Sequence, residues 1–503
     1  MTSSRNAADI RVALDHPVID VDGHMLECYP VLLDFVRDIA GREMAARFAD
    51  RLKASDDTAW HAVSPEERRR RRIARPPFFA NPTRHTLDRA TAMLPALLRE
   101  RLDEFGFDFT IVYPTLGFYL PSEPDDEVRP AVCRAYNAMV ADIFGAHADR
   151  ITPAACIPTN TPEEAIKELE YAVDELGLKV AMIASLVHRP IVAAAESGTA
   201  AFAFWLDSLG LDSEYDYDPF WSKCVELGIA PTAHTFAMGT GTRRSTTNYM
   251  YNQIGHFAEA GQAFAKALFF GGITHRFPNL NFGILEGGVG WACDLLASLV
   301  SCWEKRNGEA VTLFDPSAID RAELGNLFDR YGGDRFKGRL EGSPGAARAS
   351  LGYAAWSIDP TIMEGQASDA DLALLDDFAA AGITRAEDIL DRFAKPFYFG
   401  CEADDPMTSM AFSEKTLPFG TKLKPVLGSD IGHWDVPNMK EVLKEAHELV
   451  GKDLISEDDF REFTFTNPVK LHGGMNTNFF EGTVVEDAAA AILTGEGAGA
   501  VAA

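Results

Sequence analysis

The sequence lacks the features that would place the protein in a membrane, outside the cell or on nucleic acid. It has no run of about 18 apolar residues, and its first segment, MTSSRNAADIRVALDHP, has no basic region followed by an apolar stretch. Basic residues are few, because 47 Lys and Arg stand against 75 Asp and Glu and give a net charge of -28. This charge would repel polyphosphates over most of the surface. We therefore expect a cytoplasmic protein that binds neither nucleic acid nor membranes.

Several common catalytic and structural motifs are also missing. The seven cysteines are odd in number and never spaced as C-x-x-C, which argues against structural disulfides and against a thiolate zinc site. There is no G-x-S-x-G for a serine nucleophile, and the glycine-rich segment GTGTRRSTTN does not have the spacing of a phosphate-binding loop. What is present is a composition with 47% hydrophobic and 24% charged residues, typical of a soluble protein with a large core.

Short apolar runs alternate with amphipathic segments, which is the pattern of a parallel sheet covered by helices. The clearest unit spans residues 151–186. After the strand ITPAACIPT, Thr161 can cap a helix, Pro162 fits its first turn and Glu164 completes a capping box. Apolar residues then recur at helical spacing up to Gly177, a left-handed helix end, and VAMIASL follows as the next strand. This unit predicts one βαβ repeat.

The same signals predict eight strands along the chain. They lie at 18–24, 109–115, 151–159, 180–186, 228–235, 281–288, 397–403 and 425–430. Eight parallel strands close a barrel. We therefore predict an α/β fold, a (β/α)₈ TIM barrel, as a single domain over residues 15–480.

Two connections are much longer than barrel loops require. They are insertions at about 28–108, after the first strand, and at about 306–395, between the sixth and seventh strands. We expect them to act as caps or as subunit contacts in a homo-oligomer, a dimer. The last segment, 484–503, is rich in Gly and Ala and offers little bulk to bury, so we expect a disordered tail.

Candidate metal ligands lie at the predicted strand ends. In the first strand, Asp22 and His24 are two residues apart and share one face. His234 ends the fifth strand, Glu286 the sixth and Asp430 the eighth, all at the carboxyl-terminal edge where barrels carry their active sites. Imidazoles and carboxylates without sulfur suit zinc first, with manganese or iron as alternatives. The sequence therefore predicts a divalent metal site, although a structural role for each residue taken singly stays open.

Further candidates have competing interpretations. Glu27 follows the first pair, and His433 lies three residues beyond Asp430, where it can contact substrate or pin its own loop. His188 and Arg189 follow the fourth strand, where Arg189 can clamp a substrate carboxylate or form a surface ion pair. Glu402 ends the seventh strand and can equally belong to a helix cap.

The motifs VIDVDGH, PTAH, HRFPNLNFGILEGGVGW and LGSD resemble, in this order, those of the amidohydrolase-related family that includes aminocarboxymuconate semialdehyde decarboxylase. The resemblance runs from about Val18 to Gly474, excluding the insertions. It implies that Asp22 and His24 are the first ligand pair, that His234 is a ligand and that Asp430 is a ligand or base. Asp22 stands where the family often has histidine, and Glu286 stands in L-E-G-G where the family often has H-G-G-G.

These observations predict a metal-dependent hydrolase. A divalent ion would activate water, Asp430 or Glu286 would take its proton, and a carbonyl-like carbon of a small molecule would be attacked. The alternative is non-oxidative decarboxylation of a small carboxylic acid, aromatic acids included, which the resemblance also permits. The carboxylate of Glu286 in place of histidine favours hydrolysis, because a carboxylate is a natural base for water.

Overall fold

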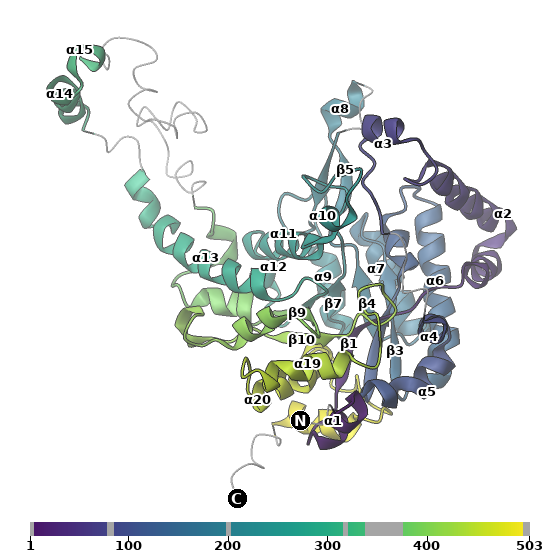
Figure 1. The fold of residues 1–503 in the computed structure, drawn as a ribbon. Coiled ribbons are helices and arrows are strands. Elements are labelled where there is room, and N and C mark those ends of the chain that lie inside the picture. The colour runs from purple at the N-terminus through teal and green to yellow at the C-terminus, as the bar shows by residue number, and fades with distance from the viewer. Residues whose placement is uncertain (1–4, 78–84, 198–202, 315–319, 338–375, 496–503) are drawn as a thin grey trace, which may run out of the picture. The chain divides into compact units, whose positions relative to one another are not determined.

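The structure is a computed structural model that describes residues 5–77, 85–197, 203–314, 320–337 and 376–495 (Figure 1). The chain divides into two compact units, one of Met1–Leu296 with Leu390–Ala503 and one of Ala297–Ile389. In the second unit the described elements are η5 (Ala310–Phe314), α14 (Arg321–Tyr331), α15 (Gly333–Phe336) and η8 (Ala379–Ala381). All the candidate site residues belong to the first unit.

The first unit contains an eight-stranded sheet whose neighbouring strands are all parallel. The strands, in their order around the sheet, are β1 (Ile19–His24), β2 (Phe109–Tyr113), β3 (Ile151–Ile157), β4 (Val180–Ile183), β7 (Pro231–Ala233), β8 (Phe282–Ile284), β9 (Phe397–Glu402) and β10 (Pro425–Gly428). Each strand lies within one of the eight predicted segments. The predicted barrel is confirmed.

The sheet closes where the end of β10 meets β1. The amide of Asp430 donates to the carbonyl of Asp22 at 2.8 Å, and the amide of His24 donates to the carbonyl of Ile431 at 2.8 Å. No side chain fits between the strands at this seam, since a Cβ on Gly428 would lie 3.0 Å from the Cβ of Asp22. The seam therefore brings the end of the last strand directly against the first candidate ligands.

Asp20, in the middle of β1, ties the seam together from inside. Its carboxylate is fully buried and accepts the backbone amides of Asp22 at 3.1 Å and Ser429 at 2.9 Å. The hydroxyls of Thr110, on β2, and of Ser429 lie 2.7 and 2.8 Å from its other oxygen. One side chain thus links β1, β2 and the segment after β10.

Helices surround the barrel (Figure 1). The α-helices of this unit are α1 (Ala7–Ala13), α2 (Tyr29–Thr58), α3 (Pro65–Arg71), α4 (Thr86–Met93), α5 (Pro95–Phe105), α6 (Val128–Phe144), α7 (Pro162–Glu170), α8 (Val192–Glu196), α9 (Asp218–Leu227), α10 (Tyr249–Gln253), α11 (His256–Phe270), α12 (Ile273–Arg276), α13 (Gly290–Arg306, whose second half enters the other unit), α19 (Val442–Gly451), α20 (Glu457–Arg461), α21 (Asn467–Gly473) and α22 (Glu486–Thr494). Short helical turns are η1 (Leu116–Ser122), η2 (Gly145–His147), η3 (Tyr171–Glu175), η9 (Leu390–Ala394), η10 (Pro406–Phe412), η11 (Pro418–Gly420) and η12 (Glu462–Thr466).

The helix predicted after Thr161 forms as α7. The side chain of Thr161 accepts the amide of Glu164, and Pro162 occupies the first turn. Aromatic residues fill the space between such helices and the sheet. Trp221 of α9 meets Phe282 of β8 edge to face at 5.6 Å between ring centroids, and Phe264 of α11 meets the same ring at 6.3 Å. These contacts hold the strand ends in fixed positions.

The structure differs from the sequence-based expectations in two places. A hairpin of β5 (Val187–Pro190) and β6 (Phe204–Asp207) follows β4 as a separate antiparallel sheet. Residues 486–494, expected to be disordered, form α22, whose first turn carries Glu486 and Asp487 where the helix dipole favours acids. The expectation of a disordered tail is therefore wrong for this segment. Residues 496–503, and residues 315–319 and 338–375 of the insertion at 306–395, lie outside the described residues.

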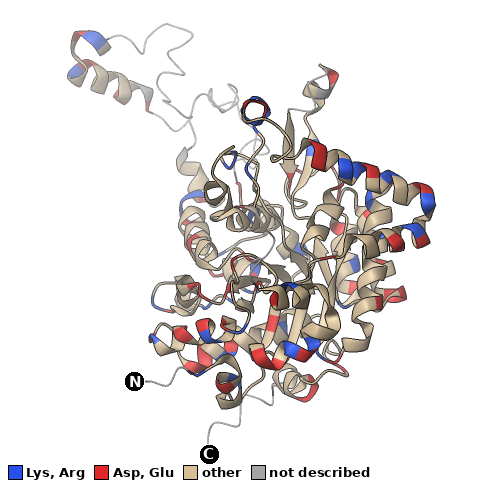
Figure 2. Ribbon diagram, turned by 45° about the vertical axis from the view of Figure 1, so that its right-hand side comes forward, with Lys and Arg blue, Asp and Glu red and all other residues tan. Residues whose placement is uncertain are grey.

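Charged residues lie mainly on the helices, and the strands carry few of them (Figure 2). The insertion at 28–108 contains α2 to α5.

In the described part of the chain, no helix is both long enough and apolar enough to cross a membrane.

Replacing Asp20 by alanine should lower the stability of the barrel strongly. The change leaves buried amides of Asp22 and Ser429 without an acceptor, which should cost about 3 kcal/mol or more. Asp20→Asn is the matched control, since its amide oxygen can still accept both backbone amides and its NH₂ can donate to both hydroxyls. Thermal unfolding of metal-depleted protein should show a much larger fall in Tm for Asp20→Ala than for Asp20→Asn. Equal Tm values for Asp20→Ala and the parent would refute this role.

Candidate metal centre

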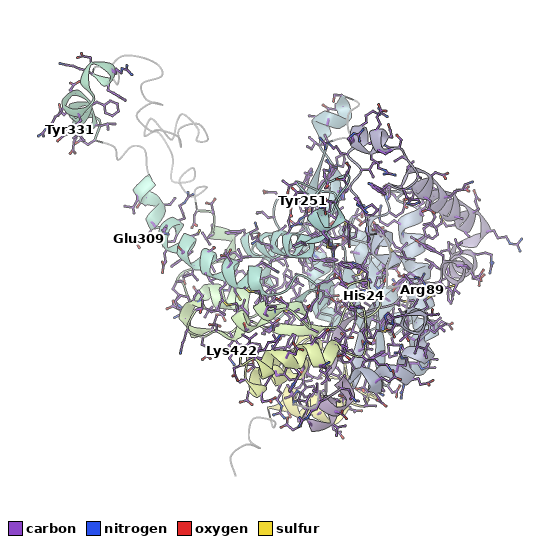
Figure 3. The ribbon with its side chains drawn as sticks, in the orientation of Figure 1. His24, Arg89, Tyr251, Glu309, Tyr331 and Lys422 are labelled. Atoms are coloured by element: carbon purple, nitrogen blue, oxygen red, sulfur yellow. The ribbon has the colours of Figure 1, made fainter. Side chains whose placement is uncertain are left out.

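Five predicted side chains meet inside the carboxyl-terminal end of the barrel, where His24 is labelled in Figure 3. Nε2 of His24 lies 3.5 Å from Asp22 Oδ1 and 3.2 Å from Asp430 Oδ1. Nε2 of His234 lies 3.4 Å from Asp22 Oδ1 and 3.1 Å from Glu286 Oε2. Ligand atoms of Asp22, His24, His234 and Glu286 all lie within 4.8 Å of one another. The fold thus brings Asp22 and His24 of β1 together with the candidate ligands that follow β7, β8 and β10.

The polar atoms that face this point lie close to one another but form no well-aligned hydrogen bond with any described residue. They are Asp22 Oδ1, His24 Nε2, His234 Nδ1 and Nε2, Glu286 Oε2, and both carboxylate oxygens of Asp430. Burying charged or polar atoms without a partner is costly, and proteins do so mainly where the atoms coordinate a metal. These oxygen and imidazole donors fit a divalent cation.

A backbone contact orients the first imidazole. Nδ1 of His24 lies 3.1 Å from the carbonyl of Pro114, which can only accept. This contact places the ring proton on Nδ1 and leaves Nε2 as a free electron pair directed at the cluster. The arrangement is the usual support of a metal-bound histidine.

Two of the carboxylates sit on a backbone that non-glycine residues rarely adopt. Glu286 has φ of 56° and Asp430 has φ of 49°, both in the left-handed region. Such a conformation costs of the order of 1–3 kcal/mol and persists only where surrounding contacts enforce it. At Asp430 the seam hydrogen bond to Asp22 does so. Positive φ directs both side chains inward just after their strands end, and sequence patterns alone gave no sign of it.

Burial and mutual repulsion raise the pKa values of the carboxylates. Burial raises the pKa of Glu286 to about 7, and burial together with the charge of Glu286 raises the pKa of Glu402 to about 9. The same two causes raise the pKa of Asp430 well above its usual value. Like charges this close require a proton or a cation between them.

The imidazoles respond in opposite directions. Burial, with repulsion from His433 and His234, lowers the pKa of His24 well below its ordinary value. Burial acts in the same direction on His234, but Asp22 and Glu286 outweigh it and raise the pKa of His234 to about 10. The neutral ring of His24 is suited to coordinate a cation, and the site as a whole attracts positive charge.

His433 belongs to the same group of residues. Its Nδ1 lies 2.5 Å from Asp430 Oδ1, and its Nε2 lies 3.0 Å from the hydroxyl of Thr115. Its ring stacks on His24, with 3.9 Å between centroids. Of the two interpretations left open by the sequence, the geometry favours a place in the site, because His433 connects Asp430 to a fixed hydroxyl.

The remaining candidates, Glu27, Arg189 and His188, make contacts outside this group of residues. Glu27 accepts backbone amides of Thr115, Leu116 and Gly117 at 2.8 to 3.1 Å, so it shapes the loop after β2. Arg189 is bound by Asp207 at 3.0 Å and by Tyr217 at 2.9 Å. Its guanidinium is thereby occupied within the β5–β6 hairpin. His188, on the same hairpin, packs on Phe204, 4.6 Å between ring centroids.

Asp20 and Asp435 were not among the predicted site residues, and Glu402 was left open between the site and a helix cap. Asp20 has the same alternation in β1 as Asp22 and His24, and this spacing could have revealed it. Glu402 and Asp435 each offer an oxygen within 4.8 Å of Glu286. They come from β9 and from the loop after β10, and only the closed barrel brings them together.

A cavity of about 320 Å³ opens beside Glu286. Its walls combine the carboxylates of Glu286, Glu402, Asp405 and Asp435 with the indole of Trp434. No Lys or Arg lines it in the part of the chain that the structure describes. Glu286 also belongs to the five candidate ligands described above, which we call the metal-ligand cluster, so the cavity borders this cluster at Glu286.

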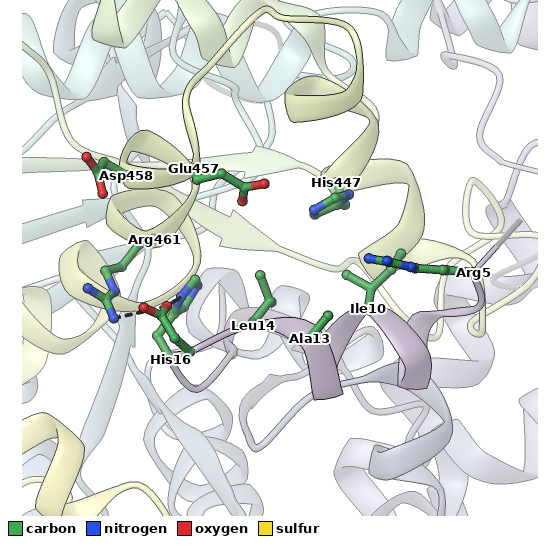
Figure 4. Close-up of a pocket in the computed structure, with 10 residues that line it drawn as sticks. Arg5, Ile10, Ala13, Leu14, His16, His447, Glu457, Asp458 and Arg461 are labelled. Carbon is green, nitrogen blue, oxygen red and sulfur yellow. Dashed lines mark hydrogen bonds and ion pairs between the residues drawn. The ribbon is translucent and has the colours of Figure 1, made fainter. Parts of the chain in front are cut away.

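A second cavity, of about 300 Å³, lies near the start of β1, between α1, α19 and α20 (Figure 4). Three of its polar groups are paired, as Asp15 is held by Arg461 at 3.0 Å and by His16 at 3.1 Å. Because active sites of such barrels lie at the opposite, carboxyl-terminal ends of the strands, we assign it no chemistry.

Solved structures similar to this chain include 2,6-dihydroxybenzoate decarboxylase from Rhizobium, with 15% identity, 91% of this chain and 98% of that chain covered and a TM-score of 0.44. Another is 5-carboxyvanillate decarboxylase from Sphingomonas paucimobilis, with 13% identity, 91% and 98% coverage and a TM-score of 0.48. A third is an amidohydrolase from Mycobacterium avium subsp. paratuberculosis K-10, with 16% identity, 92% and 100% coverage and a TM-score of 0.48.

A family model described as Amidohydrolase matches residues 19–336, from the start of β1 to the end of α15. This match takes in Asp22, His24, His234 and Glu286, and it confirms the family resemblance inferred from the motifs. Because it spans well over half of the chain, this protein belongs to the amidohydrolase family of enzymes.

Proposed function

We propose that this protein is a metal-dependent hydrolase of a small organic substrate. Asp22, His24, His234 and Asp430 would hold one divalent ion, zinc first, with manganese or iron as alternatives. When bound, the ion would supply Lewis-acid chemistry that polarises a carbonyl-like group and lowers the pKa of water. The observation that carries the proposal is the convergence of buried carboxylate and imidazole atoms of Asp22, His24, His234 and Glu286 within 4.8 Å of one another.

Glu286 is the residue we assign to proton transfer. Its side chain is only 4% exposed, and its Oε2 lies 3.1 Å from Nε2 of His234. It also borders the cavity, so it faces both the ligand cluster and an incoming substrate. A carboxylate placed in this way can take a proton from water and then return it to the leaving group.

Asp430 and His433 support this step from the opposite side of the cluster. Asp430 contacts both His24 and His433, and Thr115 fixes the far nitrogen of His433. These side-chain contacts hold the carboxylate of Asp430 in one orientation, as expected of a ligand that must stay in place during turnover.

Decarboxylation of a small carboxylic acid is the alternative reaction at the same site. It would require the substrate carboxylate to enter beside Glu286 and Glu402. The acidic cavity walls oppose this, since like charges in a poorly solvated space repel strongly. The reaction can be identified from its products, because hydrolysis incorporates oxygen-18 from labelled water and decarboxylation releases carbon dioxide.

Alanine at Asp22 or His24 should abolish metal binding and leave the barrel folded. The parent protein should carry about one divalent transition ion per chain, and either variant should carry far less, because each loses a donor that no neighbour replaces. Elemental analysis by mass spectrometry together with circular dichroism measures both effects. His188→Ala removes an exposed histidine outside the cluster and should retain the metal. Full metal content in both Asp22→Ala and His24→Ala would rule out this ligand set.

Glu286→Gln should retain the metal and lower turnover about 10²-fold or more, because the amide keeps the size of the side chain and removes its basicity. Asp430→Asn should lose both metal and turnover, since an amide oxygen is a weaker ligand than a carboxylate. A panel of amides, lactones, thioacids and hydroxybenzoates first identifies a substrate, and turnover and metal content are then measured together.

Glu259→Gln is the control for this series, because Glu259 is a half-exposed carboxylate on α11 paired with Arg243. It should leave turnover and metal content unchanged. Near-normal turnover in Glu286→Gln would remove Glu286 from catalysis, and metal loss in that variant would make it a ligand.

A further inference from the structure

The cavity beside the metal-ligand cluster is lined by carboxyl groups and by no Lys or Arg among the described residues. Oxygens of Glu286, Glu402 and Asp435 all lie within 4.8 Å of one another. Among the described residues, none of these three carboxylates forms an ion pair with a Lys or Arg. Oδ1 of Asp435 and Oε2 of Glu286 are buried and have no hydrogen-bond partner there. The side chain of Glu286 is 96% buried between His234, which its Oε2 contacts at 3.1 Å, and the carboxyl groups of Glu402 and Asp435.

From this arrangement we propose that the cavity recognises a protonated amino group of the substrate. The inference rests on the proposed hydrolase function and names the class of substrate, an amide or ester with an ammonium group close to the attacked carbon. Glu402 and Asp435 are the recognition residues, and Glu286 is shared between the ammonium group and the reaction.

The spacing of the three carboxylates suits an ammonium group. An ammonium nitrogen donates three hydrogen bonds of about 2.8 Å in a tetrahedral arrangement, which places the three acceptors about 4.6 Å apart. One oxygen from each of Glu286, Glu402 and Asp435 lies within 4.8 Å of the other two, a limit that allows this separation. The three residues come from the segment after β8, from the end of β9 and from the loop after β10. One compact cation can therefore contact all three.

Aromatic side chains supply a second wall for a cationic ligand. Trp434, next in sequence to Asp435, lines the cavity and is held edge to face by Tyr249, with 5.8 Å between ring centroids. Phe257 lines the cavity as well. Aromatic faces attract ammonium groups and pack against apolar parts of a ligand. An aryl or alkyl amine thus finds both charge and surface complementarity here.

A substrate carboxylate finds no counterpart in the cavity. Arg189, the arginine that sequence analysis suggested as a carboxylate clamp, is occupied by Asp207 and Tyr217. His256 is the histidine that lines the cavity among the described residues, and its Nε2 contacts Gln253 at 3.1 Å. Selection for an amine over an acid follows from the residues that are present.

Binding of three small probes of similar shape tests the proposal without requiring turnover. Isothermal titration of the metal-loaded protein with benzylamine, benzyl alcohol and benzoate should give affinity at least about tenfold higher for benzylamine than for the other two, which corresponds to about 1.4 kcal/mol. Glu402→Gln and Asp435→Asn should each weaken benzylamine binding about tenfold and leave benzyl alcohol binding unchanged. Asp404→Asn is the matched control, because it removes an exposed charge next to the cavity and should change neither.

Several results would overturn the proposal. One is benzoate binding as tightly as benzylamine, and another is benzylamine affinity unchanged in both Glu402→Gln and Asp435→Asn. Loss of benzylamine binding in the metal-free Asp22→Ala variant would mean that the amine coordinates the ion. A second divalent ion per chain, lost in Glu402→Gln and not displaced by benzylamine, would assign the three carboxylates to a metal.

The outcome can be separated from that of the hydrolase proposal. If benzylamine binds as expected but no amino-bearing amide or ester incorporates oxygen-18, the amine site stands and the hydrolase function fails. If substrates without an amino group are hydrolysed and benzylamine does not bind, the function stands and the amine site fails.

Discussion

Closure of the barrel between β1 and β10 is the constraint on which the rest of the site depends. Two strands separated by roughly 400 residues are held by two backbone hydrogen bonds and by the buried carboxylate of Asp20. Because Asp22 and His24 stand on one side of this seam and Asp430 on the other, the closing contact and the assembly of the metal-ligand cluster are one event. A loosened seam would separate the ligands before it unfolded the helices, since the cluster tolerates displacements of only a few tenths of an ångström.

The cluster itself is unfavourable in the absence of a cation. Several buried carboxylates repel one another, and two of them sit on left-handed backbone that costs free energy. This cost is acceptable only because the parallel strands and their aromatic contacts with the surrounding helices stabilise the barrel independently. Binding of a divalent ion would then relieve the repulsion and add its binding free energy to the folded state. Stability and function oppose one another at this point of the chain.

The sequence predicted the parts of the site that depend on strand ends, and it missed the parts that depend on loops. Asp22, His24, His234, Glu286 and Asp430 were found because every parallel strand of a barrel delivers its carboxyl end to the same face. Glu402 was placed at a strand end but left open between the site and a helix cap, whereas Asp435 was missed because it lies in the loop after β10 and such loops have no periodicity. The β5–β6 hairpin was missed for a different reason, since β5 follows the apolar run of β4 almost directly and each of its two strands has only four residues.

Long-range and local charge act in the same direction on a substrate. The net charge of -28 makes the surface repel anions and attract cations before any specific contact forms. Inside the barrel, Asp22, Glu286, Asp430, Glu402 and Asp435 place five carboxyl groups close together, and burial with mutual repulsion raises the pKa of Glu286, Asp430 and Glu402. Glu402 and Asp435 line the cavity beside Trp434, where a bound cation would favour ionised carboxylates. An incoming ammonium group would complete the charge balance that the metal begins, so recognition of the substrate and readiness of Glu286 to accept a proton would be coupled through one electrostatic field.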